Sequence, residues 1–335
     1  MPRDLPSEAA AVFRFIAERT GAEAVQDARI ETLAGGAVLR HWRLDFALLG
    51  GTMPGRQSWV LRREGATKLG IGLSRAREFA LQRAVFGAGL AVAEPLFMCC
   101  DETVLGAPFY LMRRLPGVTD GTAITQAGEN APLAAALARE LARLQKLALG
   151  ERLGILGLPP QDPVAARLCE LEAALDGDDD PQPVARWALC WLRRRQPPPL
   201  EPVLCHGDFR TGNYLVEDGC LTGILDWDFA QWGDPDEDIA WFCSRHWRFA
   251  AAARDAGGLA PRAVFCDAYE AAAGRRLDPE RLHYWSAMAS LRWLVIALKQ
   301  RDRFLKQGEA SLDLALTGRR VAECEHEILA LTGSG

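Results

Sequence analysis

The fold of this chain is decided by residues 203–228, which read VLCHGDFRTGNYLVEDGCLTGILDWD. Two short apolar runs, 214–217 and 221–225, flank the dipeptide Asp218-Gly219. An Asp-Gly pair between apolar runs is the strongest short signal for a β-hairpin. The stretch therefore predicts two paired strands joined by a tight turn.

Three oxygen-bearing side chains are expected at the open end of this hairpin. Asn213 and Asp226 lie within one residue of being cross-strand partners, and Asp208 lies in the loop that leads to the same end. An amide oxygen and two carboxylates suit a hard cation such as Mg²⁺. In a plainer interpretation Asp208 and Asn213 form turns and Asp226 caps a helix. That interpretation explains each residue alone but not why all three are expected together.

The pattern His206-Gly207-Asp208-x4-Asn213, followed eighteen residues after Asp208 by Asp226, resembles a known family. It is similar to the catalytic and metal-binding segments of the aminoglycoside phosphotransferase and choline kinase family, which has a protein-kinase-like fold. The resemblance implies that Asp208 is the catalytic base and that Asn213 and Asp226 hold Mg²⁺. It also implies that His206 holds the loop through hydrogen bonds.

A narrower similarity covers residues 226–238, DWDFAQWGDPDED. This run resembles the kinase-like domains fused to acyl-CoA dehydrogenases and their free-standing bacterial relatives, although Asp228 stands where those relatives often carry Glu. The similarity makes a small hydroxy compound as plausible an acceptor as an antibiotic. The acidic residues within it have two interpretations: they attract a cationic acceptor, or they are structural, with Asp238 accepting hydrogen bonds from the catalytic-loop backbone. We favour the second for Asp238.

The remainder of the chain fits an α+β, protein-kinase-like bilobal fold. Between residues 28 and 61, short β-prone runs alternate with Gly/Pro turns, as in a small antiparallel sheet, and a helix is expected over 75–86. Later segments are mainly helical. The resemblance thus implies a β-rich, nucleotide-binding N-terminal lobe over 1–114 and a mainly helical, catalytic and substrate-binding lobe over 115–335.

The resemblance also implies nucleotide-binding residues. Arg62 stands where most kinases carry a Lys that contacts the α- and β-phosphates, with Arg63 as the alternative, and Glu78 resembles the helix carboxylate that pairs with that Lys. Glu78 has a plainer interpretation as an exposed residue paired with Arg75 or Arg83. Met112 is expected behind the adenine, whose edge the backbone of Arg113 and Leu115 would read. The full nucleotide-binding set is Gly35, Gly36, Arg62, Glu78, Met112, Arg113 and Leu115.

The implied function is a small-molecule kinase that uses Mg²⁺ and transfers phosphate from ATP or GTP to a hydroxyl group. The alternative is a catalytically weak, nucleotide-binding pseudokinase, because the usual Lys is missing. The Asp-x-Asp of residues 226–228 also suggests a phosphatase of the haloacid dehalogenase type. Ala230 and the long stretch upstream argue against that class.

The composition of the chain limits which binding partners and which cellular compartment are expected. The 335 residues carry 39 Lys and Arg against 44 Asp and Glu, a formal charge of −5, which argues against nucleic-acid binding. Apolar runs such as 293–298 fall far short of the ~20 residues that span a bilayer. Nine cysteines without a C-x-x-C pair, and a start without signal-peptide character, predict a cytoplasmic protein with reduced thiols.

Overall fold

The computed structural model describes residues 6–33, 41–64, 72–147 and 155–333, and the chain divides into two compact units. Unit 1 comprises Met1–Gly117, Glu151–Ile155 and Thr222–Phe229, and unit 2 comprises Val118–Gly150, Leu156–Leu221 and Ala230–Gly335. The sequence placed the lobe boundary between residues 114 and 115. The structure divides after Gly117, and the chain returns briefly to unit 1 around Asp226.

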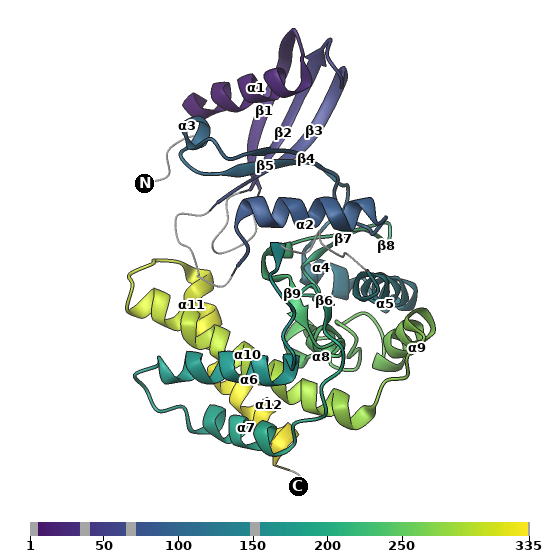
Figure 1. Ribbon diagram of the computed structural model, residues 1–335, viewed down its shortest axis with the longest axis vertical. Coiled ribbons are helices and arrows are strands. Elements are labelled where there is room, and N and C mark those ends of the chain that lie inside the picture. The colour runs from purple at the N-terminus through teal and green to yellow at the C-terminus, as the bar shows by residue number, and fades with distance from the viewer. Residues whose placement is uncertain (1–5, 34–40, 65–71, 148–154, 334–335) are drawn as a thin grey trace. The chain divides into compact units, whose positions relative to one another are not determined.

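Unit 1 is built on a five-stranded antiparallel sheet with the strand order β1-β2-β3-β5-β4 (Figure 1). Its strands are β1 (Ala24–Leu33), β2 (His41–Leu49), β3 (Gly55–Arg63), β4 (Pro95–Cys99) and β5 (Phe109–Arg113). Its helices are α1 (Pro6–Thr20), α2 (Arg75–Gly87) and α3 (Glu102–Leu105), with the short 3₁₀ turn η2 (Trp227–Phe229).

Alternating side chains give the sheet one apolar face. Along β2, every second residue is buried, as expected for a strand with one face in a core. Helix α1 packs its apolar side against this face, as Figure 1 shows. The shared core consists mainly of Val12, Phe15, Ile16, Trp42, Leu44, Phe46, Leu48, Trp59, Leu61, Phe109 and Leu111.

Helix α2 begins where the sequence predicted, because Ser74 caps it by accepting a hydrogen bond from the Arg77 N–H. A series of buried hydrogen bonds then fixes the distance of α2 from the sheet. The Gln82 amide donates to the Ala93 carbonyl at 2.8 Å, and the Tyr110 hydroxyl donates to Gln82 Oε1 at 3.1 Å. These contacts determine where Glu78, one turn earlier on α2, points.

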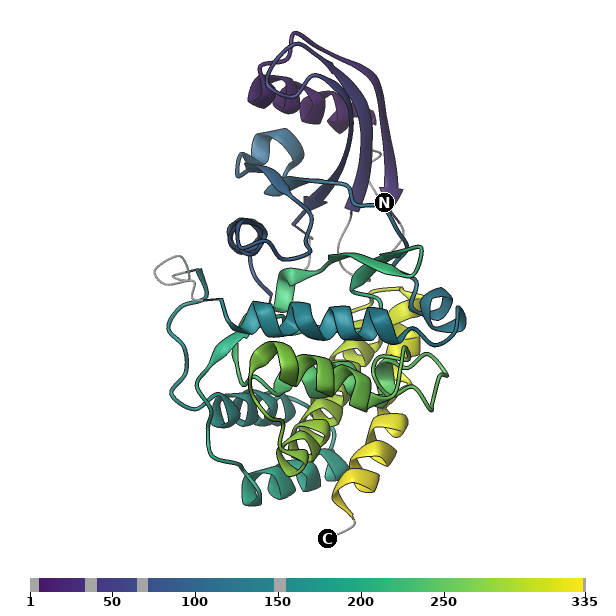
Figure 2. The same ribbon diagram turned by 90° about the vertical axis from the view of Figure 1, so that its right-hand side faces the viewer.

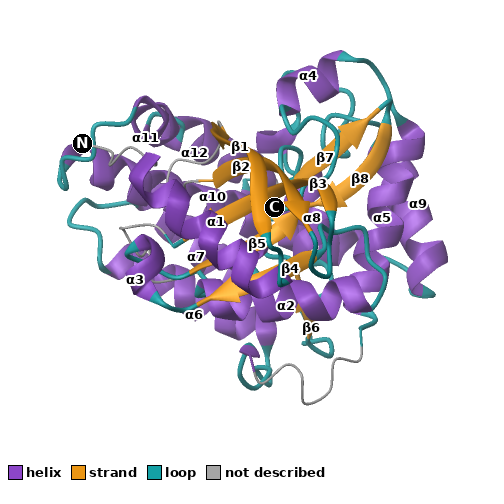
Figure 3. Cartoon of the chain, turned by 90° about the horizontal axis from the view of Figure 1, so that it is seen from above, coloured by secondary structure: helices purple, strands orange, loops and turns teal. Residues whose placement is uncertain are grey.

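Unit 2 is mainly helical (Figure 3). Its helices are α4 (Gly121–Gln126), α5 (Ala131–Gln145), α6 (Pro163–Asp176), α7 (Pro183–Arg194), α8 (Glu237–Cys243), α9 (Arg262–Ala273), α10 (Pro279–Leu305), α11 (Leu312–Gly318) and α12 (Val321–Thr332), with the 3₁₀ turn η3 (Arg245–Trp247). Its short strands are β6 (Val203–Cys205), β7 (Tyr214–Glu217) and β9 (Gln231–Gly233), and the unit boundary falls within β8 (Cys220–Ile224).

The core of unit 2 lies between α6, α7, α10 and α12, where leucines and two tryptophans are buried. Helices α5 and α9 lie side by side, which Figure 2 also shows. All nine cysteines are free thiols. Among the described helices, none combines the length and apolar character that crossing a bilayer requires.

The predicted hairpin is confirmed. Strands β7 and β8 form a two-stranded sheet, and Asp218 and Gly219 turn the chain with φ of 50° and 76°. Positive φ at both turn positions is the requirement that Asp-Gly meets at low cost. Strand β6, which leads into the loop of Asp208, pairs with β9.

Candidate active site

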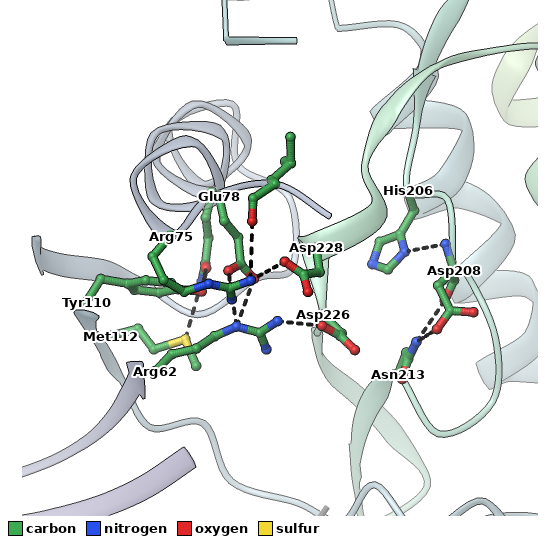
Figure 4. Close-up of polar contacts among 12 residues, drawn as sticks. Arg62, Arg75, Glu78, Tyr110, Met112, His206, Asp208, Asn213, Asp226 and Asp228 are labelled. Carbon is green, nitrogen blue, oxygen red and sulfur yellow. Dashed lines mark hydrogen bonds and ion pairs between the residues drawn. The ribbon is translucent and has the colours of Figure 1, made fainter. Parts of the chain in front are cut away.

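Arg62 joins two carboxylates within unit 1. Its side chain is 4% exposed, and its Nε lies 2.9 Å from Glu78 Oε1. Its Nη2 donates to Asp226 Oδ1 at 2.5 Å. Figure 4 shows the guanidinium of Arg62 between these two acids. The planar fork of Arg contacts both carboxylates at once, which the single ammonium of a Lys does less well.

Arg75 forms a second bridge that the sequence analysis did not assign. It pairs with Glu78 one turn along α2 and with Asp228 (Figure 4). The interpretation of Glu78 as an exposed residue is wrong, because Glu78 is fully buried, but its contact with Arg75 is present. The i,i+3 spacing was visible in the sequence, whereas the bridge to Asp228 depends on tertiary packing.

Burial and charge compete in this cluster. Burial disfavours the charge on Arg62, but Glu78 and Asp226 outweigh it and raise the pKa of Arg62 well above its usual value. Burial raises the pKa of Glu78, against the opposing effect of Arg62 and Arg75. His41 is neutral beside them, because burial and the charge of Arg62 lower its pKa to about 3. The cluster is thus a compact, charged network in a largely dry setting.

Asp226 has an unusual backbone. Its φ is 64°, in the left-handed region that residues other than glycine rarely adopt, and its side chain is 32% exposed. Strained residues of this kind cluster at functional sites, where surrounding structure fixes them. Here the neighbouring Asp228 anchors the turn, since its carbonyl accepts the Leu73 N–H at 2.7 Å and its carboxylate binds Arg75.

The residues expected near the adenine lie at the end of β5. Met112 and Arg113 are its last two residues, and Leu115 packs so closely on Gly223 that a Cβ there would lie 2.3 Å from Leu115 Cδ1. The Arg113 N–H donates to the Glu94 carbonyl at 2.8 Å. Because the Arg113 N–H is used in this way, the Arg113 carbonyl is the backbone group that remains as the predicted contact to adenine. The predicted loop residues Gly35 and Gly36 lie outside the described residues.

In unit 2, Asp208 receives hydrogen bonds from three side chains. Asn213 Nδ2 donates to Asp208 Oδ2 at 2.6 Å and to its carbonyl at 2.9 Å. Trp241 Nε1 donates to Oδ1 at 2.8 Å, and Arg210 Nε lies 3.1 Å from both oxygens. Figure 4 shows the amide of Asn213 turned toward Asp208. The carboxylate is therefore held in one orientation.

Asp238 organises the backbone of this loop, as predicted. Its carboxylate accepts the N–H groups of His206 at 2.7 Å and Gly207 at 3.0 Å. Burial raises the pKa of Asp238 to about 7, with Glu237 acting in the same direction and the two backbone donors against it. His206 is fully buried, and its Nδ1 accepts the Asp208 N–H at 3.2 Å, in keeping with the hydrogen-bonding role expected of it.

Trp241 is held in place by a cation–π contact with Arg292. The Arg292 guanidinium lies 4.5 Å from the Trp241 ring centroid, and its Nη2 donates to the Gly207 carbonyl at 2.5 Å. Arg210 lies in the same way over Trp247, at 4.6 Å. No catalytic role for these tryptophans was predicted from the sequence. Trp241 lies three residues after Asp238, on a helix, which is the signal that it faces the same loop.

The acidic cluster after β9 is not a site for a cationic acceptor. Asp234 and Asp236 are fully buried, and both bind Arg281. Asp236 also binds Arg275 at 2.6 Å. Because arginines from the α9–α10 region neutralise them, these acids hold helices together, so the structural interpretation is correct for this part of the chain.

The structure thus brings the predicted residues together in two groups. Arg62, Glu78 and Asp226 meet within unit 1, and Asp208 and Asn213 meet within unit 2. Among the described residues, no three His, Cys, Asp or Glu side chains form a ready-made metal site. The predicted metal ligands Asn213 and Asp226 belong to different units.

Comparison with known proteins identifies the family. The family model described as "phosphotransferase enzyme family" matches residues 46–294. Acyl-CoA dehydrogenase family member 11 of Gallus gallus is 31% identical over 198 residues, which are 56% of this chain and 25% of that protein. Member 10 of Mus musculus is 27% identical over 199 residues, 56% of this chain and 18% of that protein. The chain thus spans about a quarter or less of these curated relatives.

Solved structures confirm the fold. A protein from Ralstonia eutropha JMP134, provisionally named an aminoglycoside phosphotransferase, superposes with a TM-score of 0.75 at 20% identity, over 97% of this chain and 98% of that one. A choline/ethanolamine kinase family protein from Mesorhizobium loti gives 0.62 at 18% identity, over 99% and 100%. A thermostable mutant of aminoglycoside phosphotransferase APH(4)-Ia, in a ternary complex with ADP and hygromycin B, gives 0.61 at 19%, over 97% and 99%. The predicted α+β, protein-kinase-like fold is correct.

Proposed function

Because this chain belongs to the phosphotransferase enzyme family, we propose that it is a small-molecule kinase that transfers the γ-phosphate of ATP or GTP to a hydroxyl group. The observation that carries the proposal is the Asp208 carboxylate, held by Asn213, Trp241 and Arg210. Phosphoryl transfer depends on positioning and charge stabilisation, and a fixed carboxylate is what orients an acceptor hydroxyl.

In the proposed reaction, Asp208 accepts the proton of the acceptor hydroxyl. The hydroxyl oxygen forms a bond to the γ-phosphorus while the bond from that phosphorus to the bridging oxygen breaks, which releases the nucleoside diphosphate. Trp241 and Asn213 act by holding the carboxylate, and Asp238 acts one step further away by holding the loop backbone. Arg62, positioned by Glu78, contacts the phosphates.

The oxygen donors of Asn213 and Asp226 fit Mg²⁺. Asn213 donates to Asp208 from its amide nitrogen, so its amide oxygen is not used in that contact. The Asp226 side chain is partly exposed and offers a carboxylate, the ligand that Mg²⁺ prefers. When bound, Mg²⁺ would neutralise charge on the phosphate oxygens. We assign Asn213 and Asp226 as its protein ligands.

The comparisons support a nucleotide co-substrate and do not distinguish an adenine from a guanine nucleotide. Aminoglycoside kinases of this fold have been solved with ADP and with AMP-PNP, and aminoglycoside 2'-phosphotransferase-IIIa with GDP. We propose that Met112, Arg113 and Leu115 contact the base and that Gly35 and Gly36 cover the phosphates. The hygromycin B complex and the choline/ethanolamine kinase relative support a small hydroxylated acceptor.

One observation favours the pseudokinase alternative. Arg62 already binds Asp226, the proposed metal ligand, at 2.5 Å. A catalytic cycle requires at least one oxygen of this carboxylate to be available to the metal. If the ion pair persists with nucleotide bound, the protein binds nucleotide without transferring phosphate efficiently.

Incubation with Mg²⁺, ATP or GTP and a panel of hydroxy compounds tests the proposal, with nucleoside diphosphate release as the readout. A kinase releases diphosphate only with its acceptor, and Asp226→Ala shifts the magnesium dependence to higher concentration. Nucleotide binding without acceptor-dependent release across the panel would favour the pseudokinase. An unchanged magnesium dependence in Asp226→Ala would contradict the metal assignment.

A further inference from the structure

A cavity of about 250 Å³ lies in unit 2 and is not lined by Arg210, Asn213 or Trp241, the side chains that hold Asp208. Its walls come from the segment after α8, the start of α9 and single faces of α10 and α12. The α10 wall consists of Pro279, His283, Ser286 and Ser290, which recur at helical spacing. The cavity is therefore a regular feature of the helix packing in this unit.

Positive charge gathers in this cavity. Arg245, Arg248 and Arg262 line it, and Glu327 is the one acidic residue among the described side chains of its wall. Arg245 Nη1 lies 3.6 Å from Glu327 Oε2, which is longer than a hydrogen bond. Arg245, Arg248 and Arg262 are called the arginine triad below.

The acids near the triad form only loose ion pairs with Arg245 and Arg262. Arg262 Nε lies 3.6 Å from Asp255 Oδ2, again beyond hydrogen-bond distance. Arg248 donates to two neutral carbonyls, those of Cys243 at 3.0 Å and Ala252 at 3.4 Å, and it forms no ion pair with a described carboxylate. Within the described part of the chain, the Nε atoms of Arg248 and Arg262 are buried without a hydrogen-bond partner.

Holding these cations close together in a partly buried place costs free energy. Burial lowers the pKa of Arg248, and the charge of Arg262 lowers it further, whereas Asp255 acts in the opposite direction. Buried donors without partners are rare, and each raises the free energy of the folded state unless something binds to it. An oxyanion would satisfy both the donors and the charge.

We propose that the arginine triad forms a binding site for a small multivalent oxyanion, a compound that carries phosphate or carboxylate groups. Guanidinium groups match such anions because they donate two parallel hydrogen bonds to them. The volume lies below the ~300–1,000 Å³ of drug-sized ligand pockets, which favours a compact anion. This site is separate from the proposed kinase chemistry and does not depend on it.

Calorimetric titration of the full chain with pyrophosphate tests the site, and citrate in a parallel titration distinguishes phosphate from carboxylate ligands. Saturable binding that weakens as salt rises is expected. Arg248→Met and Arg262→Met should each weaken it by about tenfold or more, the usual loss for one charge-assisted contact. If Arg248→Met does not fold, Arg245→Met at the exposed rim is the replacement.

Arg193→Met is the matched control, since Arg193 pairs with Glu172 on the surface of α7. It removes the same charge from unit 2 and should leave affinity unchanged. Two results would overturn the proposal. One is the absence of saturable binding of either anion, and the other is wild-type affinity in the Arg248 and Arg262 variants, which would locate the anion elsewhere.

Discussion

Trp241 donates its indole N–H to Asp208 Oδ1 at 2.8 Å, and this hydrogen bond ties α8 to the loop that carries the proposed base. The Arg292 guanidinium stacks on the face of the Trp241 ring, and it also donates a hydrogen bond to the Gly207 carbonyl of the same loop. The carboxylate is thus oriented by a rigid aromatic residue, whose ordering costs little entropy. Preorganised catalytic groups of this kind lower the activation free energy of a reaction.

Trp241→Phe should lower kcat by about tenfold, because it keeps an aromatic side chain and removes one hydrogen bond to the base. KM for the nucleotide should stay the same, since Trp241 holds Asp208 and not the phosphates. Steady-state kinetics measures both parameters.

Trp285→Phe provides the matched control. Trp285 is also buried, and its Nε1 has no hydrogen-bond partner among the described residues. This variant should keep the wild-type kcat. Equal losses in the Trp241 and Trp285 variants would mean that core packing, and not the bond to Asp208, sets the rate.

Arg62→Met should raise KM for ATP by about tenfold or more, since it removes a charge-assisted contact to phosphate. Arg63→Met is the control, because Arg63 is the neighbouring cation and faces Glu8 at 3.7 Å. Thermal unfolding of both variants is needed as well, because Arg62→Met deprives the buried Glu78 of a partner. A larger effect of Arg63→Met on KM would transfer the phosphate role to that residue.

Asp236→Ala should destabilise the fold by about 3–5 kcal/mol, the range for breaking a buried ion pair, because it leaves Arg281 and Arg275 without this partner. Urea unfolding measures the loss. If stability is unchanged and only the affinity for cationic acceptors falls, the acidic cluster is a substrate site after all.

His246 should make the protein less stable in mild acid. Burial lowers its pKa to about 3, and Arg320, Arg245 and Arg248 add to this. The unfolded chain binds a proton near pH 6.5, and the folded chain does so only near pH 3, so stability is lost as pH falls from 6.5 toward 3. At pH 5.5 the loss from this residue is about 1.4 kcal/mol.

His246→Gln should flatten the dependence of unfolding free energy on pH between 6.5 and 4.5. His326, exposed on α12, is the control for the same substitution. A slope that is unchanged in His246→Gln would show that other groups cause the acid sensitivity.

The hairpin and the start of α2 could be predicted because each depends on local signals, whereas the pairing of Arg62 with Glu78 was implied by the family resemblance. Asp-Gly sets the turn, Ser74 caps the helix, and the strand and helix follow in the expected sequence. The hydrogen bonds that the Asp238 carboxylate accepts from the backbone of the His206 loop were also predicted and are present.

The contacts that were missed join segments far apart in the chain. Arg75 meets Asp228 across 153 residues, and Trp241 meets Asp208 across 33. Neither spacing is periodic, and the one indirect signal was the position of Trp241 three residues after Asp238 on the same helix. The arginine triad could not be predicted from the sequence either. Arg245 lies in η3, Arg248 follows η3, and Arg262 begins α9.

The most direct test of the kinase assignment is nucleoside diphosphate release by wild type and Asp208→Asn, with the acceptor found in the panel. Asn preserves the shape of Asp208 but cannot take the hydroxyl proton. The assignment of Asp208 as the base predicts that Asp208→Asn binds nucleotide as wild type does and loses acceptor-dependent turnover by about 10²-fold or more. Wild-type turnover in Asp208→Asn would contradict it.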